Sequence, residues 1–168
     1  MEQKVGYTKR TKTPEQALQS LMRMCARSER SSGDAMRLMK RWGVADEDAR
    51  KVLLRLQNER FIDDGRFAEA FVRDKINLSG WGVYKIKSAL RAKGVSRDII
   101  ESVVEPMLAE TDMGERLEEM MRRRLRTLKY NSPYEAKTKL IRFATSRGYD
   151  MEQAIECASK LIRDLEED

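Results

Sequence analysis

Three glycines at nearly equal spacing constrain the fold of this chain more than any other feature. Gly43, Gly94 and Gly148 lie 51 and 54 residues apart, and each has a basic residue one or two positions before it and an apolar residue directly after it. A glycine just past a helix end adopts a left-handed conformation at little cost, because it has no Cβ. The spacing therefore predicts three tandem repeats, each with a helix ending at its glycine.

Apolar residues flank each glycine at helical spacing. Six, nine, ten and thirteen positions after the glycines stand Ala49, Val52, Leu53, Leu56; Ile100, Val103, Val104, Met107; and Ala154, Cys157, Ala158, Leu161. Eight, five and four positions before them stand Ala35, Leu38, Met39; Ile86, Ala89, Leu90; and Leu140, Phe143, Ala144. Both patterns predict amphipathic helices. Asp46 and Ser96 are placed to cap the helices that follow the first two glycines.

A leading helix completes each repeat, over residues 14–27, 64–76 and 113–128. We predict an all-α fold of three tandem three-helix repeats over residues 14–59, 60–110 and 113–166, preceded by a flexible basic N-terminus over residues 1–13. Repeats of about 50 residues bury little surface alone, so neighbours must pack together into an elongated, curved molecule. A compact globule of nine helices is the alternative.

Charge favours a polyanionic partner and the residue types argue against catalysis. The net charge is +6, and residues 113–148 carry ten basic and four acidic side chains. The chain has no histidine, no phosphate-binding glycine loop and no long apolar run, so we expect no catalytic residue, metal, cofactor or membrane span. Asp63 and Asp64 have the residue types of a Mg²⁺ site, but a helix cap is the better interpretation. Cys25 and Cys157 fit reduced thiols in the core.

Basic residues recur in the middle helix of each repeat and are the candidate contacts. A solvated helix face is the usual explanation for one such helix, but recurrence in three repeats favours a shared cationic surface. The middle-helix candidates are Arg37, Lys40 and Arg41; Lys85, Lys87, Arg91 and Lys93; and Lys137, Lys139, Arg142 and Arg147. Arg122, Arg123 and Arg124 form the densest cluster and suit either phosphate or an acidic protein groove. Trp81 either stacks on a partner or fastens its own loop.

Two central segments resemble the RecX regulatory family. They are residues 60–73, RFIDDGRFAEAFVR, and residues 80–96, GWGVYKIKSALRAKGVS, and a weaker likeness extends over residues 15–165. The matching signature residues, which we expect to be mainly structural, are Phe61, Asp63, Asp64, Arg66, Phe67, Gly80, Gly82, Leu90, Lys93 and Gly94. Gly33 departs from the family pattern, which usually has an acidic or helix-forming residue there.

The resemblance implies a cytoplasmic protein that binds RecA in the groove of its DNA filament and restrains ATP hydrolysis, filament extension and strand exchange. It implies no catalytic residue and no cofactor. We expect a monomer that also binds single- or double-stranded DNA weakly and without sequence preference. The alternative is a DNA-binding helical module that acts without RecA, such as a helix-turn-helix transcription factor.

Overall fold

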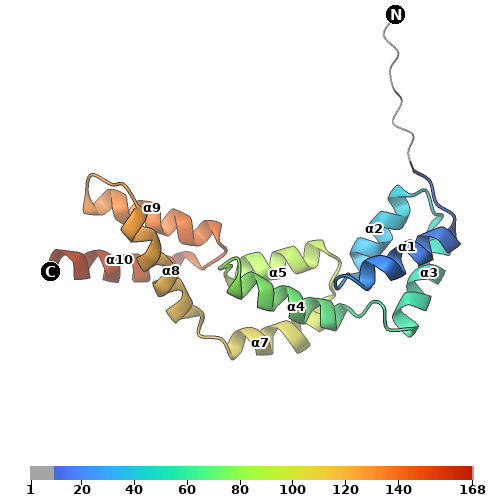
Figure 1. The fold of residues 1–168 in the computed structure, drawn as a ribbon. Helices are drawn as coiled ribbons and strands as arrows, with labels where there is room; N and C mark the ends of the chain where they lie inside the picture. Colours follow the sequence, from blue (N-terminus) through green and yellow to red (C-terminus); the bar gives the residue numbers. More distant parts are fainter. Residues whose placement is uncertain (1–9, 168) are drawn as a thin grey trace, which may run out of the picture. The chain divides into compact units, whose positions relative to one another are not determined.

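The computed structural model describes residues 10–167, and this part of the chain is helical without any strand (Figure 1). The predicted all-α class is therefore confirmed, whereas most of the expected flexible N-terminus lies outside the described residues. The helices are α1 (Pro14–Cys25), α2 (Ser32–Arg41), α3 (Asp46–Asn58), α4 (Asp64–Asn77), α5 (Val83–Ala92), α6 (Arg97–Ile99), α7 (Glu105–Ala109), α8 (Met113–Thr127), α9 (Pro133–Ser146) and α10 (Met151–Glu167).

The chain divides into two compact units. Unit 1 holds the residues up to Phe67 together with Lys93–Val95, and unit 2 holds Ala68–Ala92 and the residues from Ser96 onward. Unit 1 contains α1, α2 and α3, while unit 2 contains α5 to α10 and most of α4. The elongated and curved form expected of the whole chain stays a prediction.

The middle helices α2, α5 and α9 bury the same positions of the repeat. Eight and four residues before each glycine, the side chains are buried, whereas five residues before it they are half-buried. The buried pairs are Ala35 and Met39, Ile86 and Leu90, and Leu140 and Ala144. The residue directly after each glycine is buried as well, which fixes where the chain turns back toward the core. The amphipathic pattern that predicted these helices is thus confirmed position by position.

Each repeat glycine adopts the predicted left-handed conformation, with φ between +74° and +90°. The next helix is capped two residues later, where Ser96 accepts the Ile99 N–H and Asp150 accepts the Gln153 N–H. The prediction that Asp46 caps α3 is wrong. Ala45 holds that position without a side-chain bond, because the cap lies two residues after Gly43 and Asp46 is already the first helical residue.

The last helix of the second repeat is not a regular α-helix. Between α6 and α7 the chain forms a π-helical turn, Ile100–Val104, in which the Glu105 N–H bonds to the carbonyl five residues earlier. Pro106 follows directly, and a proline within a helix lacks an N–H and crowds the carbonyl four residues before it. The wider turn makes room for the proline and shifts the register. As a result, Leu108 is buried where the sequence pattern predicted Met107.

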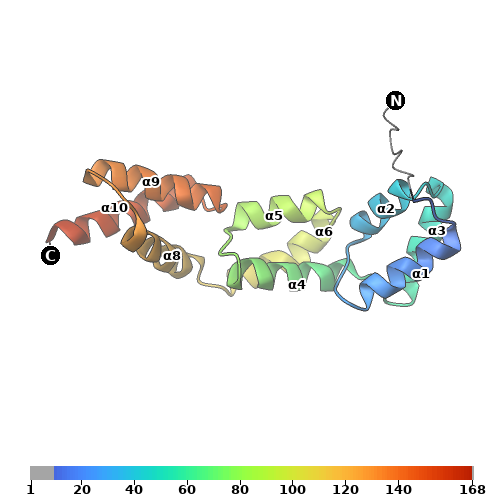
Figure 2. The same ribbon diagram turned by 45° about the horizontal axis from the view of Figure 1, so that its top comes forward.

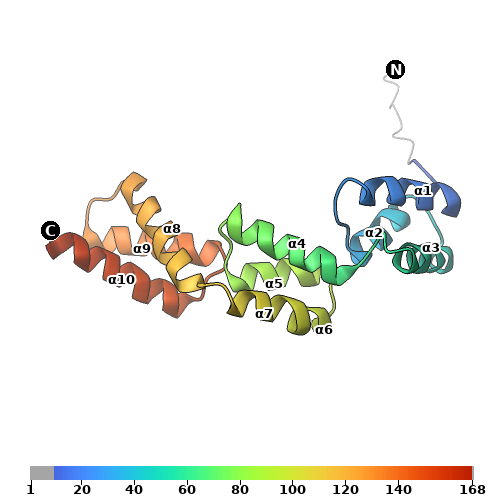
Figure 3. The same cartoon turned by 60° about the horizontal axis from the view of Figure 1, so that its bottom comes forward.

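Unit 2 ends in a three-helix group formed by α8, α9 and α10, in which α10 packs against both other helices (Figure 3). Their shared core contains Leu117 and Met121 from α8 and Leu140 from α9. The α10 side chains that complete it are small, with Ala154 and Ala158 fully buried, so the helix axes can approach closely. This group carries the most basic segment of the chain on α8 and α9.

Candidate nucleic-acid and protein interface

The middle helices of the second and third repeats meet end to end (Figure 2). The Gly82 N–H donates to the Arg147 carbonyl at 2.7 Å, and the Tyr84 N–H donates to the Gly148 carbonyl at 3.1 Å. The first N–H groups of α5 and the last carbonyls around α9 have no partner within their own helices, so each end satisfies the other. A Cβ on Gly82 would lie 2.6 Å from Gly148 atoms, which explains why this position is glycine.

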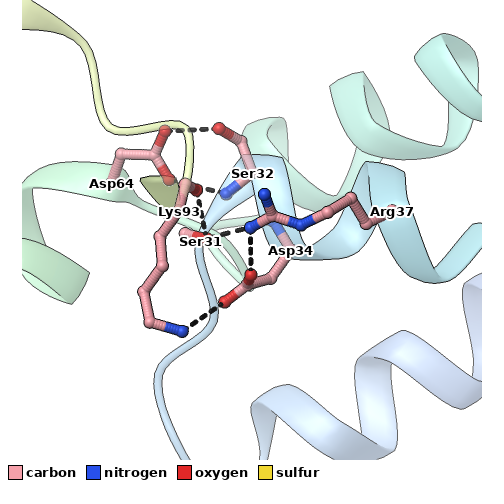
Figure 4. A network of polar contacts seen from close by, with 6 residues as sticks. All are labelled: Ser31, Ser32, Asp34, Arg37, Asp64 and Lys93. Carbon is pink, nitrogen blue, oxygen red and sulfur yellow. Dashed lines mark hydrogen bonds and ion pairs between the residues drawn. The ribbon is translucent and has the colours of Figure 1, made fainter. Parts of the chain in front are cut away.

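A second joint, within unit 1, uses the same place in the repeat. Ser31 precedes α2 as Gly82 precedes α5, and its hydroxyl donates to the Lys93 carbonyl at 2.8 Å (Figure 4). Lys93, like Arg147, directly precedes a repeat glycine. Gly33 lies against this turn, since a Cβ there would overlap the Lys93 carbonyl and lie 2.9 Å from the Gly94 Cα. The departure of Gly33 from the family pattern therefore has a steric cause.

Carboxylates surround this joint at the start of α2 (Figure 4). Asp64 accepts the Ser32 N–H at 2.7 Å and also the Ser32 hydroxyl. Asp34 accepts from Arg37 at 2.5 Å and from the Lys93 ammonium at 3.3 Å. Burial opposes ionisation of Asp34, but these cationic partners outweigh burial and hold its pKa below the usual value. Both carboxylates lie near the start of α2, where their negative charge interacts favourably with the positive end of the helix dipole.

The two aspartates of the signature have different structural roles. Asp63 caps α4 by accepting the Arg66 N–H at 3.0 Å, as predicted, whereas Asp64 bonds to α2 and not to the start of its own helix. Arg66 binds Glu29 with its Nε at 2.6 Å and donates to the Arg60 carbonyl. Within the described residues no three metal-ligating side chains come together.

The predicted contact residues fall into two groups. Eight of them have polar partners: Arg37 and Lys93 with Asp34, Lys87 with Glu105, Arg122 with Glu118, Arg123 with Glu119, Lys139 with Glu135, Lys85 with the Ser146 carbonyl, and Arg147 with the Ser79 carbonyl. Among the described residues, no carboxylate pairs with Lys40, Arg41, Arg91, Arg124, Lys137 or Arg142. The positive charges of the second group are more available to an external anion. The exposed ion pairs of the first group are weak, so those residues can also release their partners readily.

Basic side chains of α8, α9 and the residues just after each helix line two adjoining hollows, which share Arg124 and Phe143 and which we call the arginine groove. The first hollow, of about 470 Å³, is bounded by α8, α9 and the loop before α5. The second, of about 520 Å³, lies between the ends of α8 and α9. The basic lining residues are Arg116, Arg123, Arg124, Lys129, Lys139, Arg142 and Arg147. Glu119 is the one acidic residue of this lining and is paired with Arg123.

The Phe143 ring lies close to two guanidinium groups of the arginine groove. The guanidinium carbons of Arg124 and Arg147 are 5.4 and 5.1 Å from its ring centre, within the range of a cation–π contact. Arg147 also donates to the Ser79 carbonyl at 2.8 Å, so it holds the loop before α5 against the third repeat. The sequence pattern had assigned Phe143 only to the apolar face of its helix.

Trp81 fastens its own loop, which is one of the two alternatives that the sequence left open. Its ring meets Phe71 edge to face with centroids 6.1 Å apart, and the Lys75 and Lys85 ammonium groups each lie 4.6 Å from its centre. These contacts join α4 to the start of α5, next to the glycine joint. Lys85 is therefore held by both Trp81 and the end of α9.

Three-helix groups recur at the glycine turns, and polar joints connect helix ends of neighbouring groups. This arrangement defines a tandem repeat protein. This chain matches the family model described as the second three-helix domain of RecX over residues 63–104, and that of the third over residues 110–157. The chain therefore belongs to the RecX family, as the central segments predicted.

Named relatives support the same membership. The chain is 30% identical over 141 residues to the regulatory protein RecX of Pseudomonas entomophila strain L48, covering 83% of this chain and 88% of that one. It is 32% identical over 136 residues to that of Chromohalobacter salexigens, covering 79% and 84%. A crystal structure of regulatory protein RecX shares the fold with a TM-score of 0.74 at 20% identity, covering 90% of this chain and 73% of that one. RecX from Lactobacillus salivarius gives 0.72 at 17%, covering 88% and 96%.

Proposed function

We propose that this protein binds RecA in the groove of its DNA filament and mainly inhibits ATP hydrolysis, filament extension and strand exchange. Membership in a family of regulatory proteins supports this proposal most directly, since family models match the second and the third repeat. We propose a cytoplasmic location, because the partner and its DNA lie there. None of the helices in the described part of the chain is long and apolar enough to cross a membrane.

The arginine groove and further cations of α2, α5 and α9 supply the side chains for this binding. A filament on DNA is a polyanion, and each phosphate neutralised by Lys or Arg releases condensed counterions. We propose that Lys40, Arg41, Arg91, Arg124, Lys137 and Arg142 make the main contacts, since no carboxylate among the described residues pairs with them. The candidates that pair with surface carboxylates contribute by releasing those carboxylates and pairing with anionic groups of the partner. Binding to free DNA is weak and non-specific, and the protein acts as a monomer.

Purified protein tests the proposal directly. Added below equimolar amounts to RecA on circular single-stranded DNA, it should slow ATP hydrolysis, and raising the salt should weaken the effect. An unchanged rate at equimolar protein and low salt would contradict the proposal. Unrelated duplexes serve as a control, because equal affinity for them excludes the sequence-selective binding expected of a transcription factor.

A further inference from the structure

The first hollow of the arginine groove combines apolar and cationic walls. Met120, Phe143 and the buried Tyr149 supply the apolar surface, while Arg116, Arg124 and Arg147 stand around it with Arg123. The loop before α5 closes one side, and its Leu78 side chain is 82% exposed. A volume of about 470 Å³ lies within the range of small-molecule sites, about 300–1,000 Å³. The hollow therefore suits a ligand of limited size that is both flat and anionic.

Arg124 is the side chain best placed to hold such a ligand. It is exposed, has no carboxylate partner among the described residues, and lies over the Phe143 ring. A planar guanidinium held on one face by an aromatic ring offers its other face to a further flat group. Unpaired nucleobases stack on both aromatic rings and guanidinium planes, while arginine forks bind their phosphates.

Acidic peptides and duplex DNA would each match only part of this hollow. An aspartate or glutamate side chain engages the guanidinium groups but has no flat apolar part to cover Phe143 and Met120. A duplex presents phosphates to the rim, but its bases stay stacked in the helix and do not enter a hollow of about 470 Å³. A nucleotide of a single strand supplies both the anionic phosphate and the flat base.

We infer that this hollow receives one unpaired nucleotide of single-stranded nucleic acid, with its base against Arg124 and Phe143 and its phosphate among Arg116, Arg123 and Arg147. The inference rests on the proposed function, since it assigns the nucleic-acid contact of the RecA filament to this site. The second hollow, lined by Lys129, Lys139 and Arg142, continues the path for the adjoining backbone. Base contact gives the protein a preference for single strands.

Fluorescence anisotropy with the full-length protein tests the inference. The probes are a labelled oligothymidine, the same backbone with abasic sites, and a hairpin duplex of equal charge, all at one salt concentration. Wild-type protein should bind oligothymidine at least about fivefold more tightly than the abasic strand, which corresponds to the stacking of one base. Equal affinity for the two strands overturns the inference.

Variants separate base contact from general charge. F143L keeps the apolar volume but removes the ring, and it should weaken oligothymidine binding about fivefold while duplex binding changes less than twofold. R124Q should weaken single-strand binding similarly. R126Q removes the same charge from the same helix outside both hollows, so it should change affinity less than twofold. If R124Q and R126Q behave alike, or if F143L affects both probes equally, the inference is wrong.

The RecA assay distinguishes failure of the site from failure of the proposed function. Inhibition of RecA by wild-type protein without any preference for bases would leave the function standing and refute the site. A base preference that depends on Phe143, without any effect on RecA, would leave the site standing and refute the function. Circular dichroism of F143L shows whether its fold is intact, and R124Q tests the same site from an exposed position.

Discussion

Alanine in place of Gly148 should break the joint between the second and third repeats. Gly148 has φ +90°, a conformation that residues with a Cβ rarely adopt, and a Cβ there would overlap Lys85 and lie 2.6 Å from its backbone nitrogen. Because the obstacle includes backbone, a side-chain rotation cannot relieve it. The start of α5 must move away from the end of α9, and both joint hydrogen bonds weaken.

The cost has two parts. The left-handed conformation costs about 1–2 kcal/mol for an alanine. Loss of two hydrogen bonds, each contributing about 0.5–1.5 kcal/mol, adds about 1–3 kcal/mol. The free energy of unfolding of unit 2 should therefore fall by about 2–5 kcal/mol. Gly80→Ala is the matched control, since Gly80 also has positive φ (+63°) in the same unit but its Cβ would meet only the Met120 sulfur at 3.5 Å.

Urea unfolding followed by circular dichroism measures both changes, and hydrogen exchange locates them. G80A should cost only about 1–2 kcal/mol. The Tyr84 amide, which donates to the Gly148 carbonyl, should exchange faster in G148A than in G80A. If G148A destabilises no more than G80A and leaves Tyr84 protected, the end-to-end joint does not contribute as described.

Two further predictions concern ionisable groups. Because the folded-state pKa of Asp34 is lowered, its contribution to stability is complete above the ordinary aspartate value of 3.8 and is lost as the pH falls below it. D34N should therefore be less stable than wild type at pH 7, and thermal melts should show the difference shrinking below pH 3.8; a constant difference would exclude an ionic role. Burial raises the pKa of both the Cys25 and Cys157 thiols, so iodoacetamide at pH 7 should modify native protein more slowly than urea-unfolded protein, and equal rates would contradict their packing.

The periodic part of the fold could be predicted because it depends on short-range rules. Helical spacing of apolar residues placed the middle helices, and the need for a left-handed residue placed the three turns. The π turn before Pro106 escaped prediction because periodicity alone does not show how a helix accommodates a proline. The cap at Asp46 was wrong by one residue, since the sequence offered an acceptor but the turn after Gly43 fixes where the helix begins.

The joints and the arginine groove lay beyond sequence reasoning because they unite distant residues. Ser31 and Lys93 are 62 positions apart, and only coordinates show that the serine hydroxyl meets that carbonyl. The sequence pattern predicted that Phe143 is a core residue, whereas in the structure the guanidinium groups of two arginines lie close to its ring. Arg116 and Lys129 were not predicted as contacts, because neither belongs to a middle helix or to the dense cluster at Arg122–Arg124. The serine at the cap position of α2 and the glycine at its start were the available signals for the joint at Lys93.

Co-sedimentation with RecA filaments on single-stranded DNA measures whether the arginine groove contacts the filament. R124E/R142E reverses two groove charges that lack carboxylate partners among the described residues, and R50E/K51E makes the same change in net charge on α3. R124E/R142E should weaken filament binding about tenfold or more, while R50E/K51E should stay within about twofold of wild type. Equal binding by the two variants would contradict this contact.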